Sequence, residues 1–272
     1  MKITILNENY VDKQNLISEH GLSILIQVKN YNIIFDTGQN LSVVNNYKYL
    51  AENVSKVDFI VLSHGHYDHT GGLAKHPEFF KKLANKIFAS KYVFDKHLRK
   101  KSEKEFDEIG LSKDVCDEFH FEYIDDYKEI NDDIYILSNI KRYEPFVADL
   151  RLYCEIDGKY VRDPFRDELY MFIKHNGKNI LITGCSHAGI INIVKDCQNK
   201  MNVDRIDYLI GGMHLFRSDE ATIDRVVDFF LNEIKVENII TGHCTGLDPF
   251  FYIKSKLKSN LFYMKTGMVF NI

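Results

Sequence analysis

Short apolar segments that end at glycine or histidine constrain the fold of this chain more than any other feature. Phe59–Leu62 is such a segment, and it runs directly into the histidine-rich stretch Ser63–Gly72. Three later segments share one form, an apolar run, then glycine, then cysteine or histidine: Ile180–His187, Leu209–His214 and Ile239–Gly246. Runs of about four to eight residues of this kind predict buried strands. The sequence therefore predicts strands whose ends carry metal-ligating side chains.

Further strands and helices alternate along the rest of the chain. The other strand signals are Ile3–Leu6, Leu22–Val28, Ile33–Asp36, Ile134–Leu137, Leu152–Ile156 and Leu169–Lys174. Lys29–Asn32 predicts a hairpin turn, and so does Asn176-Gly177. Apolar residues recur at helical spacing after Gly189 and after Ser218. No linker, repeat or low-complexity segment interrupts the pattern, so we expect a single domain over residues 1–272 with a layered α/β architecture.

One segment differs in composition from its surroundings. Residues 91–118 carry dense charge of both signs, including Lys96, Arg99 and Lys104. Charge runs usually face water, so this pattern predicts a charged helical insertion. The alternative is a lid that brings cations to an anionic substrate.

Charge and cysteine content exclude several classes of function. The 272 residues contain 35 Lys and Arg against 39 Asp and Glu, a net charge of −4, which argues against a nucleic-acid or anionic-membrane partner. The 5 cysteines include no Cys-x-x-Cys pair, which indicates a reducing compartment. Neither a signal peptide nor an apolar run of about 18 residues is present. We therefore expect a cytoplasmic protein with a small-molecule partner.

The Ser63–Gly72 stretch predicts a metal site. The side chains of His64, His66, Asp68 and His69 lie within six residues. This spacing does not line one face of a helix, but a strand-to-loop turn brings the four together. His64 and His66 would then hold one ion, and the other two would face a neighbouring one. Glycines remove Cβ atoms where the chain folds tightly: Gly65, Gly71 and Gly72.

At these residues the sequence resembles the metallo-β-lactamase-fold superfamily, whose signature is His-x-His-x-Asp-His. Three later motifs are similar to one branch, that of dihydropterin–ribofuranosylaminobenzene-phosphate synthase and related metallohydrolases: Gly184–Ile190, Gly211–Leu215 and Gly242–Gly246. The resemblance covers essentially the whole chain. It implies a four-layer αββα sandwich with a dinuclear metal site at its edge.

The resemblance also implies a ligand set. His64, His66 and His187 would hold one ion, and Asp68, His69 and His243 the other. Many relatives carry a further His before the Gly-Cys strand and an Asp at the position of Cys185. Residues 139–149 contain no His, so His187 takes the first role. Cys185 takes the second as a thiolate that bridges the ions or binds the second one, or else it is a small packing residue.

Other family positions imply roles around the metals. Asp36-Thr37-Gly38 resembles a segment that supports the metal loop through hydrogen bonds. The implied chemistry is attack by a metal-bound hydroxide, with Asp68 orienting or deprotonating the nucleophile. His214 would donate a proton or hydrogen bond to substrate, or have a structural role, and Cys244 would be a packing residue. Two divalent ions are implied, zinc first, with iron or manganese as alternatives.

Substrate contacts are expected at two residues, Arg142 and Ser186. Ser186–Gly189 opens a predicted helix, whose backbone N–H groups would receive a phosphate. Arg142 would add a bidentate contact, and Asp163–Glu168 resembles a family loop near the site. For each feature a surface turn or a salt bridge is the alternative.

The sequence thus favours a dinuclear-metal hydrolase or transferase that acts on an anionic, phosphate-bearing small molecule. One alternative is a di-iron redox protein on the same scaffold, although no cysteine pair suggests an electron relay. Another is a metal-binding ligand sensor without turnover. The fold itself does not specify the substrate.

Overall fold

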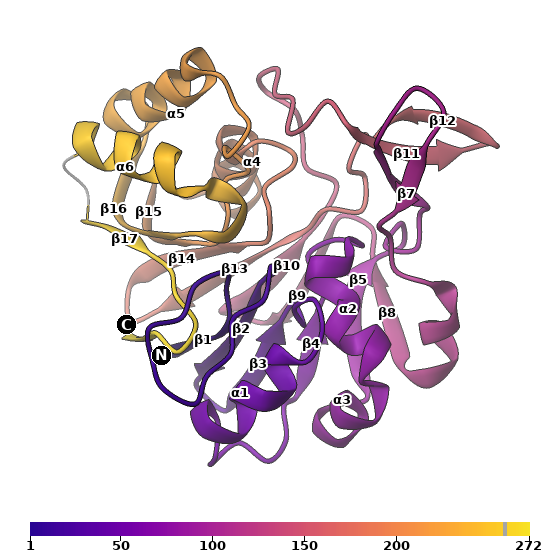
Figure 1. The fold of residues 1–272 in the computed structure, drawn as a ribbon. Coiled ribbons are helices and arrows are strands. Elements are labelled where there is room, and N and C mark those ends of the chain that lie inside the picture. Colours follow the sequence, from indigo (N-terminus) through magenta and orange to yellow (C-terminus); the bar gives the residue numbers. More distant parts are fainter. Residues whose placement is uncertain (258–259) are drawn as a thin grey trace. The chain divides into compact units, whose positions relative to one another are not determined.

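The chain folds into two compact units, each with its own β-sheet and helices (Figure 1). The computed structural model describes residues 1–257 and 260–272. The first unit comprises Met1–Asp125, Leu150–Asp167 and Lys265–Ile272, and the second comprises Asp126–Asp149 and Glu168–Met264. Both mix strands with helices, which confirms the predicted α/β class. The single-domain organisation stays a prediction.

The main sheet of the first unit has the strand order β18-β1-β2-β3-β4-β5-β8. Its strands are β1 Lys2–Asn7, β2 Ser23–Val28, β3 Tyr31–Phe35, β4 Phe59–Val61, β5 Lys86–Ser90, β8 His120–Ile124 and β18 Val269–Asn271. β2 and β3 form the predicted antiparallel hairpin. β3 and β4 run parallel, with Phe35 opposite Val61. Because their carboxyl ends meet at one edge, Asp36 lies beside the start of the histidine-rich segment.

Three helices cover this sheet in the first unit: α1 Ser42–Leu50, α2 Tyr67–Lys75 and α3 Pro77–Leu83. Tyr47, Leu73 and Phe80 from these helices pack in one core with strand residues such as Ile34 and Ile60. Full burial of such a side chain stabilises the fold by about 1.5–3 kcal/mol. Proline at the first position of α3 suits the helix start, where its missing N–H costs nothing.

The first unit also holds a smaller sheet, with strand order β12-β11-β6-β7. Its strands are β6 His97–Lys100, β7 Phe106–Glu108, β11 Leu152–Ile156 and β12 Lys159–Arg162. A 3-10 helix, Lys113–Glu118, follows β7 in the chain. The prediction of a helical insertion over residues 91–118 is therefore wrong. The charges form pairs between strands instead: Arg99 lies opposite Asp107 and binds its carboxylate at 3.1 Å. A sheet with such cross-strand ion pairs has the same mixture of positive and negative residues in its sequence as a solvent-exposed helix.

The sheet of the second unit has the order β17-β16-β15-β14-β13-β10-β9. Its strands are β9 Tyr127–Asn131, β10 Ile134–Leu137, β13 Tyr170–His175, β14 Lys178–Thr183, β15 Arg205–Ile210, β16 Lys235–Thr241 and β17 Asn260–Tyr263. The predicted turn between β13 and β14 is confirmed, with φ of 50° at Asn176 and 73° at Gly177. β14, β15 and β16 are parallel neighbours. Their carboxyl ends therefore lie together.

The described residues of the second unit form three helices and a 3-10 turn: α4 Ile190–Met201, α5 Glu220–Asn232, α6 Leu247–Lys256 and η2 His243–Thr245. Val194 of α4, Val227 of α5 and Phe250 of α6 pack in one core with the apolar residues of the sheet. This confirms the predicted helices after Gly189 and Ser218. The side chain of Asp219 caps α5 by accepting a hydrogen bond from the backbone N–H of Thr222 at 2.9 Å.

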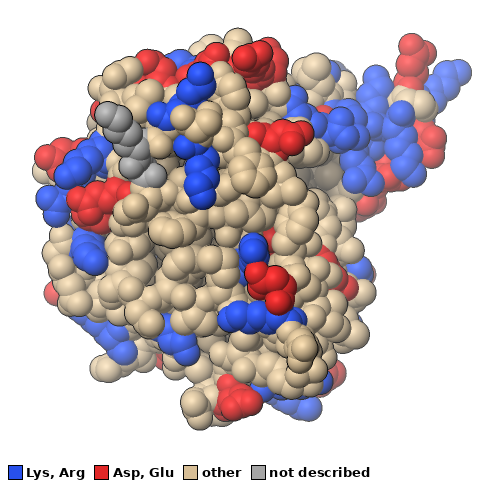
Figure 2. Space-filling view, turned by 60° about the vertical axis from the view of Figure 1, so that its left-hand side comes forward, with Lys and Arg blue, Asp and Glu red and all other residues tan. Residues whose placement is uncertain are grey.

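Three surface and thiol features complete the description. Within residues 1–257 and 260–272, no helix is long and apolar enough to cross a membrane. Four cysteines are buried and form no disulfide: Cys154, Cys185, Cys197 and Cys244. On the face drawn in Figure 2, Lys and Arg side chains are interspersed with Asp and Glu.

Candidate metal centre

The first set of candidate ligands follows β4 in the first unit. His64 and His66 lie in the loop after the strand, whereas Asp68 and His69 lie in the first turn of α2. The sequence predicted that all four side chains would lie in a turn between a strand and a loop. In the structure α2 begins at Tyr67, so the last two ligands lie on a helix. The ring centroids of His64 and His66 are 4.6 Å apart, and those of His64 and His69 are 4.3 Å apart. All four side chains are buried, so the structure brings this predicted set together.

The glycines of this segment allow the backbone to pass close to its neighbours. A Cβ atom at Gly72 would lie 2.0 Å from the carbonyl oxygen of Thr37, and one at Gly65 would lie 2.3 Å from that of Val93. Such distances are far inside van der Waals contact, so only glycine fits. The predicted tight folding is confirmed, and the chain packs against neighbouring backbone.

Asp36, which follows β3, holds the loop from behind. Its carboxylate accepts hydrogen bonds from the backbone N–H and the hydroxyl of Ser63, both at 2.7 Å. It also lies 2.6 Å from Nδ1 of His69. Thr37 adds a bond from its N–H to the carbonyl oxygen of His69. The predicted support by Asp36 and Thr37 is confirmed, and it leaves Nε2 of His69 as the nitrogen for a metal.

The electrostatics of this set suit a cation. Burial, with the nearby ring of His69, holds the pKa of His64 well below its usual range. Burial, followed by the ring of His97, lowers the pKa of His66 to about 4. Both imidazoles are therefore neutral at pH 7, and neutral imidazole is the form that binds a metal. Buried neutral imidazoles around the Asp68 carboxylate fit a divalent ion.

Two histidines that the sequence analysis missed contact this set. The ring of His97 lies edge-on to that of His66, with centroids 5.0 Å apart. His97 is clamped between buried carboxylates, with Nδ1 at 2.6 Å from Asp163 and Nε2 at 3.1 Å from Asp167. Nε2 of His20 lies 3.2 Å from the carboxylate of Asp68. Neither histidine stands near a recognisable motif, so no local signal marked it.

Asp167 contacts both His97 and the loop after β4 that carries His64 and His66, called here the ligand loop. One oxygen of its carboxylate accepts a hydrogen bond from the backbone N–H of Gly65 at 2.7 Å. Burial alone would raise the pKa of Asp167, but the charge and hydrogen bond of His97 hold it below its usual value. Arg166 in the same loop pairs with Asp95 at 2.6 Å. The Asp163–Glu168 loop, expected near the site, therefore binds the ligand loop through Asp167.

The second set of candidate ligands comes from three strand ends in the second unit. Cys185 and His187 follow β14, His214 follows β15, and His243 follows β16. Each turn contains a residue with left-handed φ: 62° at Ser186, 49° at His214 and 50° at His243. Such φ values outside glycine are costly and cluster at functional sites. The parallel pairing of the strands explains why the four side chains meet at one edge.

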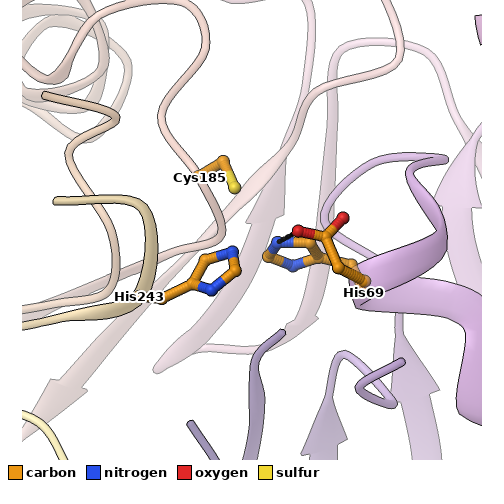
Figure 3. Close-up of side chains that lie close together, drawn as sticks. His69, Cys185 and His243 are labelled. Atoms are coloured by element: carbon orange, nitrogen blue, oxygen red, sulfur yellow. Dashed lines mark ion pairs between the residues drawn. The ribbon is translucent and has the colours of Figure 1, made fainter. Parts of the chain in front are cut away.

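Cys185 lies at the centre of this second set. Its Sγ is within 4.8 Å of a ring nitrogen of His187, of His214 and of His243. The ring centroids of His187 and His214 are 4.3 Å apart. Figure 3 shows Cys185 and His243 on their separate turns, and His69 of the first unit with its imidazole drawn. Buried thiol and imidazole groups are ligands that zinc prefers, so this donor set also fits a divalent ion.

Cys244 packs against the neighbouring turns. Its Sγ donates to the carbonyl oxygen of Cys185 at 3.4 Å. A Cβ atom at Gly212 would lie 2.4 Å from that Sγ. The thiol thus occupies the space above Gly212, as expected for a packing residue.

At the expected phosphate site before α4, three backbone N–H groups already have partners within the protein, and phosphate binding there stays a prediction. The carboxylate of Glu168 accepts hydrogen bonds from the N–H groups of His187 and Ala188, both at 2.6 Å. The N–H of Gly189 bonds to the carbonyl oxygen of Ser186. These three donors are already used. The carboxylate satisfies the same helix-end electrostatics that a phosphate would.

The two expected substrate contacts differ in their surroundings. Ser186 is fully buried, and its hydroxyl donates to the carbonyl oxygen of Gly212 at 2.6 Å. Arg142 is exposed. Substrate binding by Ser186 and Arg142 stays a prediction, as does the catalytic role of His214.

Comparison with known sequences gives the family. Residues 18–122 match the model of the metallo-beta-lactamase superfamily. The chain is 33% identical over 278 residues to the uncharacterized protein MJ0448 of Methanocaldococcus jannaschii, covering 99% of this chain and 100% of that one. It is 28% identical over 296 residues to 7,8-dihydropterin-6-methyl-4-(beta-D-ribofuranosyl)-aminobenzene-5'-phosphate synthase of the same organism, covering 99% and 96%.

Comparison with solved structures agrees with the sequences. The crystal structure of Tm1679, described as a metal-dependent hydrolase of the beta-lactamase superfamily, matches 100% of this chain and 99% of its own, with TM-score 0.87 and 26% identity. Zinc-bound PqqB from Methylobacterium extorquens matches all of both chains with TM-score 0.59 at 10% identity, a likeness of fold alone.

Proposed function

Because this chain belongs to the metallo-β-lactamase superfamily, we propose that it is a metal-dependent hydrolase or transferase acting on a phosphate-bearing small molecule. The observation that carries the proposal is the His64–His69 segment, a buried set of three imidazoles and one carboxylate in which burial lowers the pKa of His64 and His66. The 28% identical relative supports a phosphate-bearing substrate, since that protein is named as the synthase of a compound with a 5'-phosphate group.

We assign the ligands of two divalent ions from both sets. His64, His66 and His187 hold one ion, and Asp68, His69 and His243 hold the other. Cys185 contributes a thiolate to the pair. Zinc suits imidazole and thiolate ligands, and iron and manganese are the alternatives. The assignment rests on the family pattern together with the burial and the local geometry of each set.

When bound, two divalent cations lower the pKa of water and polarise a phosphate ester. The residues of the chain supply orientation and protons. Asp68, held by His20 at 3.2 Å, orients the nucleophile and accepts its proton. His214 is buried beside His187 and donates a hydrogen bond or proton to the leaving group. Asp36 fixes the ring of His69 through Nδ1.

The test is a hydrolysis screen on purified protein loaded with zinc, iron or manganese. The substrates are p-nitrophenyl phosphate, bis(p-nitrophenyl) phosphate and simple lactones. We expect turnover of a phosphate ester that is lost on chelation and that falls at least about 100-fold in His66→Ala. His120→Ala is the matched control, because His120 is exposed on β8 and belongs to neither ligand set.

Two other results would contradict this function. Consumption of oxygen or peroxide by the iron form, without ester turnover, would identify a di-iron redox protein. Stoichiometric metal with no turnover of any ester would identify a ligand sensor.

A further inference from the structure

A cavity of about 270 Å³ lies entirely within the second unit, beside the start of α4 and the start of α5. Its walls combine the 144–146 loop with the first turns of both helices. The residues that matter for its chemistry are Phe146, Gly189, Ile190, Asp219, Ala221 and Arg225. Pockets for whole drug-sized ligands have about 300–1,000 Å³. This cavity therefore has room for one portion of a substrate, such as a ring system.

The cavity wall is held in place before any ligand arrives. The side-chain oxygen of Asn192 accepts hydrogen bonds from the N–H groups of Tyr143 and Glu144, at 2.7 and 2.8 Å. Its amide nitrogen donates to the carbonyl oxygen of Glu144 at 2.9 Å. A Cβ atom at Gly189 would lie 2.8 Å from the ring of Phe146. The ring therefore packs directly on the Gly189 backbone, and little ordering remains to be done on binding.

The charges around the cavity disfavour an anion. Arg225, the cation of the lining, donates to Glu144 at 2.9 Å through Nε, to Asp228 at 3.3 Å and to Glu233 at 2.6 Å. Its guanidinium is thus already neutralised by carboxylates. Asp219, at the rim, adds a negative charge. A bound group would therefore contact mainly the apolar and aromatic parts of the wall.

The cavity is next to a proposed metal ligand along the chain. Gly189 lies two residues after His187, which corresponds to at most about 7 Å of backbone. A substrate bound through its phosphate near His187 would therefore have its other end within reach of the cavity.

We propose that this cavity binds an uncharged aromatic group of the substrate, while the phosphate of the same substrate reacts at the metal ligands. The inference rests on the proposed function for the identity of the reacting group. The ring stacks on Phe146, and Phe146 and Ala221 determine which substrates fit.

Direct binding is measured with Phe146→Trp, because the chain contains no other Trp. The probe is phenylphosphonate, and methylphosphonate has the same anionic group without the ring. We expect a saturable change in Trp emission with phenylphosphonate that methylphosphonate does not produce. Leu231→Trp, at an exposed position of α5 outside this cavity, is the control and shows no change with either probe. Equal responses to both probes would overturn the proposal.

Specificity is measured with Ala221→Phe, which places a ring at the cavity rim from an exposed position. The substrates are phenyl p-nitrophenyl phosphate and methyl p-nitrophenyl phosphate, which share a leaving group. We expect kcat/KM for the phenyl ester to fall about tenfold, the loss of one buried ring. The methyl ester should stay within about twofold. A fall shared by both esters, or by neither, would contradict the inference.

The two measurements separate this inference from the proposed function. If the metal-loaded protein hydrolyses neither ester, the proposed function fails, while the Trp titration still decides whether the cavity binds an aromatic group.

Discussion

The two ligand sets are built in opposite ways. In the first unit, all the ligands come from one segment, His64–His69, and the neighbouring residue Asp36 supports it. In the second unit, the ligands come from three different strand ends, and each turn has its own left-handed residue. The contiguous set depends on two buried carboxylates, with Asp36 holding Ser63 and His69 and Asp167 holding Gly65. The distributed set depends on several separate turns. A single substitution should therefore damage the first set more widely than the second.

The largest effect is expected for Asp36→Ala. The change removes the buried acceptor of the Ser63 N–H and of Nδ1 of His69. The Ser63 hydroxyl loses the same acceptor and keeps its contact with Nδ1 of His64, at 2.9 Å. Removing one partner of such a buried group costs about 3–5 kcal/mol. Urea unfolding measures the loss, and Asp58→Ala, at an exposed position before β4, is the control. If Asp36→Ala lowers the free energy of unfolding no more than Asp58→Ala does, Asp36 is not a main support of the His64–His69 segment.

The next largest effect is expected for glycine substitutions, whose cost in unfolding free energy should differ between the two units. Gly72→Ala places Cβ against the backbone of Thr37, which cannot move aside, and should cost about 3 kcal/mol. Gly212→Ala meets the Sγ of Cys244, which is a side chain. We expect Cys244→Ala to reduce the cost of Gly212→Ala, as measured in a double-mutant cycle by urea unfolding. Strict additivity in that cycle would show that Cys244 does not fill the space above Gly212.

A smaller effect is expected for Glu168→Gln in the second unit. The amide keeps one acceptor for the N–H groups of His187 and Ala188 but turns an N–H₂ group toward the other. One unsatisfied buried donor costs about 2 kcal/mol. Unfolding measures the cost, and hydrogen exchange at the start of α4 should quicken while exchange in α2 stays unchanged. Faster exchange in α2 as well would show that the two sets are not independently supported.

The smallest effect concerns the ion pairs at the cavity wall. Burial alone would raise the pKa of Glu144, but hydrogen bonds from Arg225 and Lys195 hold it below its usual value. A lowered pKa means stability that is present above the ordinary glutamate pKa and lost as the pH falls through the folded-state value. Glu144→Gln should therefore cost about 1 kcal/mol at pH 7 and less near pH 3. A cost independent of pH would contradict this account.

The sequence predicted the parts of the molecule that repeat a local pattern. The strands β10 and β11 and the turn at Asn176-Gly177 were legible because side-chain period and turn chemistry are local properties. The segment 91–118 was misinterpreted because its charges pair within a sheet. Arg99 of β6 binds Asp107 of β7, and Lys96 binds Glu155 of β11, 59 residues further along the chain. Local composition does not distinguish such a sheet from a solvated helix.

The candidate site shows the same division. The His64–His69 segment and the three glycine-ended strands were identified from spacing, and Asp36 from its family segment. The contacts of His97 and His20 escaped prediction because they depend on tertiary approach. The contact of Glu168 with the turn before α4 was missed because its carboxylate reaches the N–H groups of His187 and Ala188 from a position 19 residues before His187 in the chain.

The most direct test of the account is metal content by elemental analysis, with one ligand removed from each set. We expect about two divalent ions per chain in the unaltered protein. His66→Ala and His243→Ala should each lose about one, and His120→Ala should lose none. Full metal content in both ligand variants, with native folding by circular dichroism, would contradict the assignment of these two sets to a pair of ions.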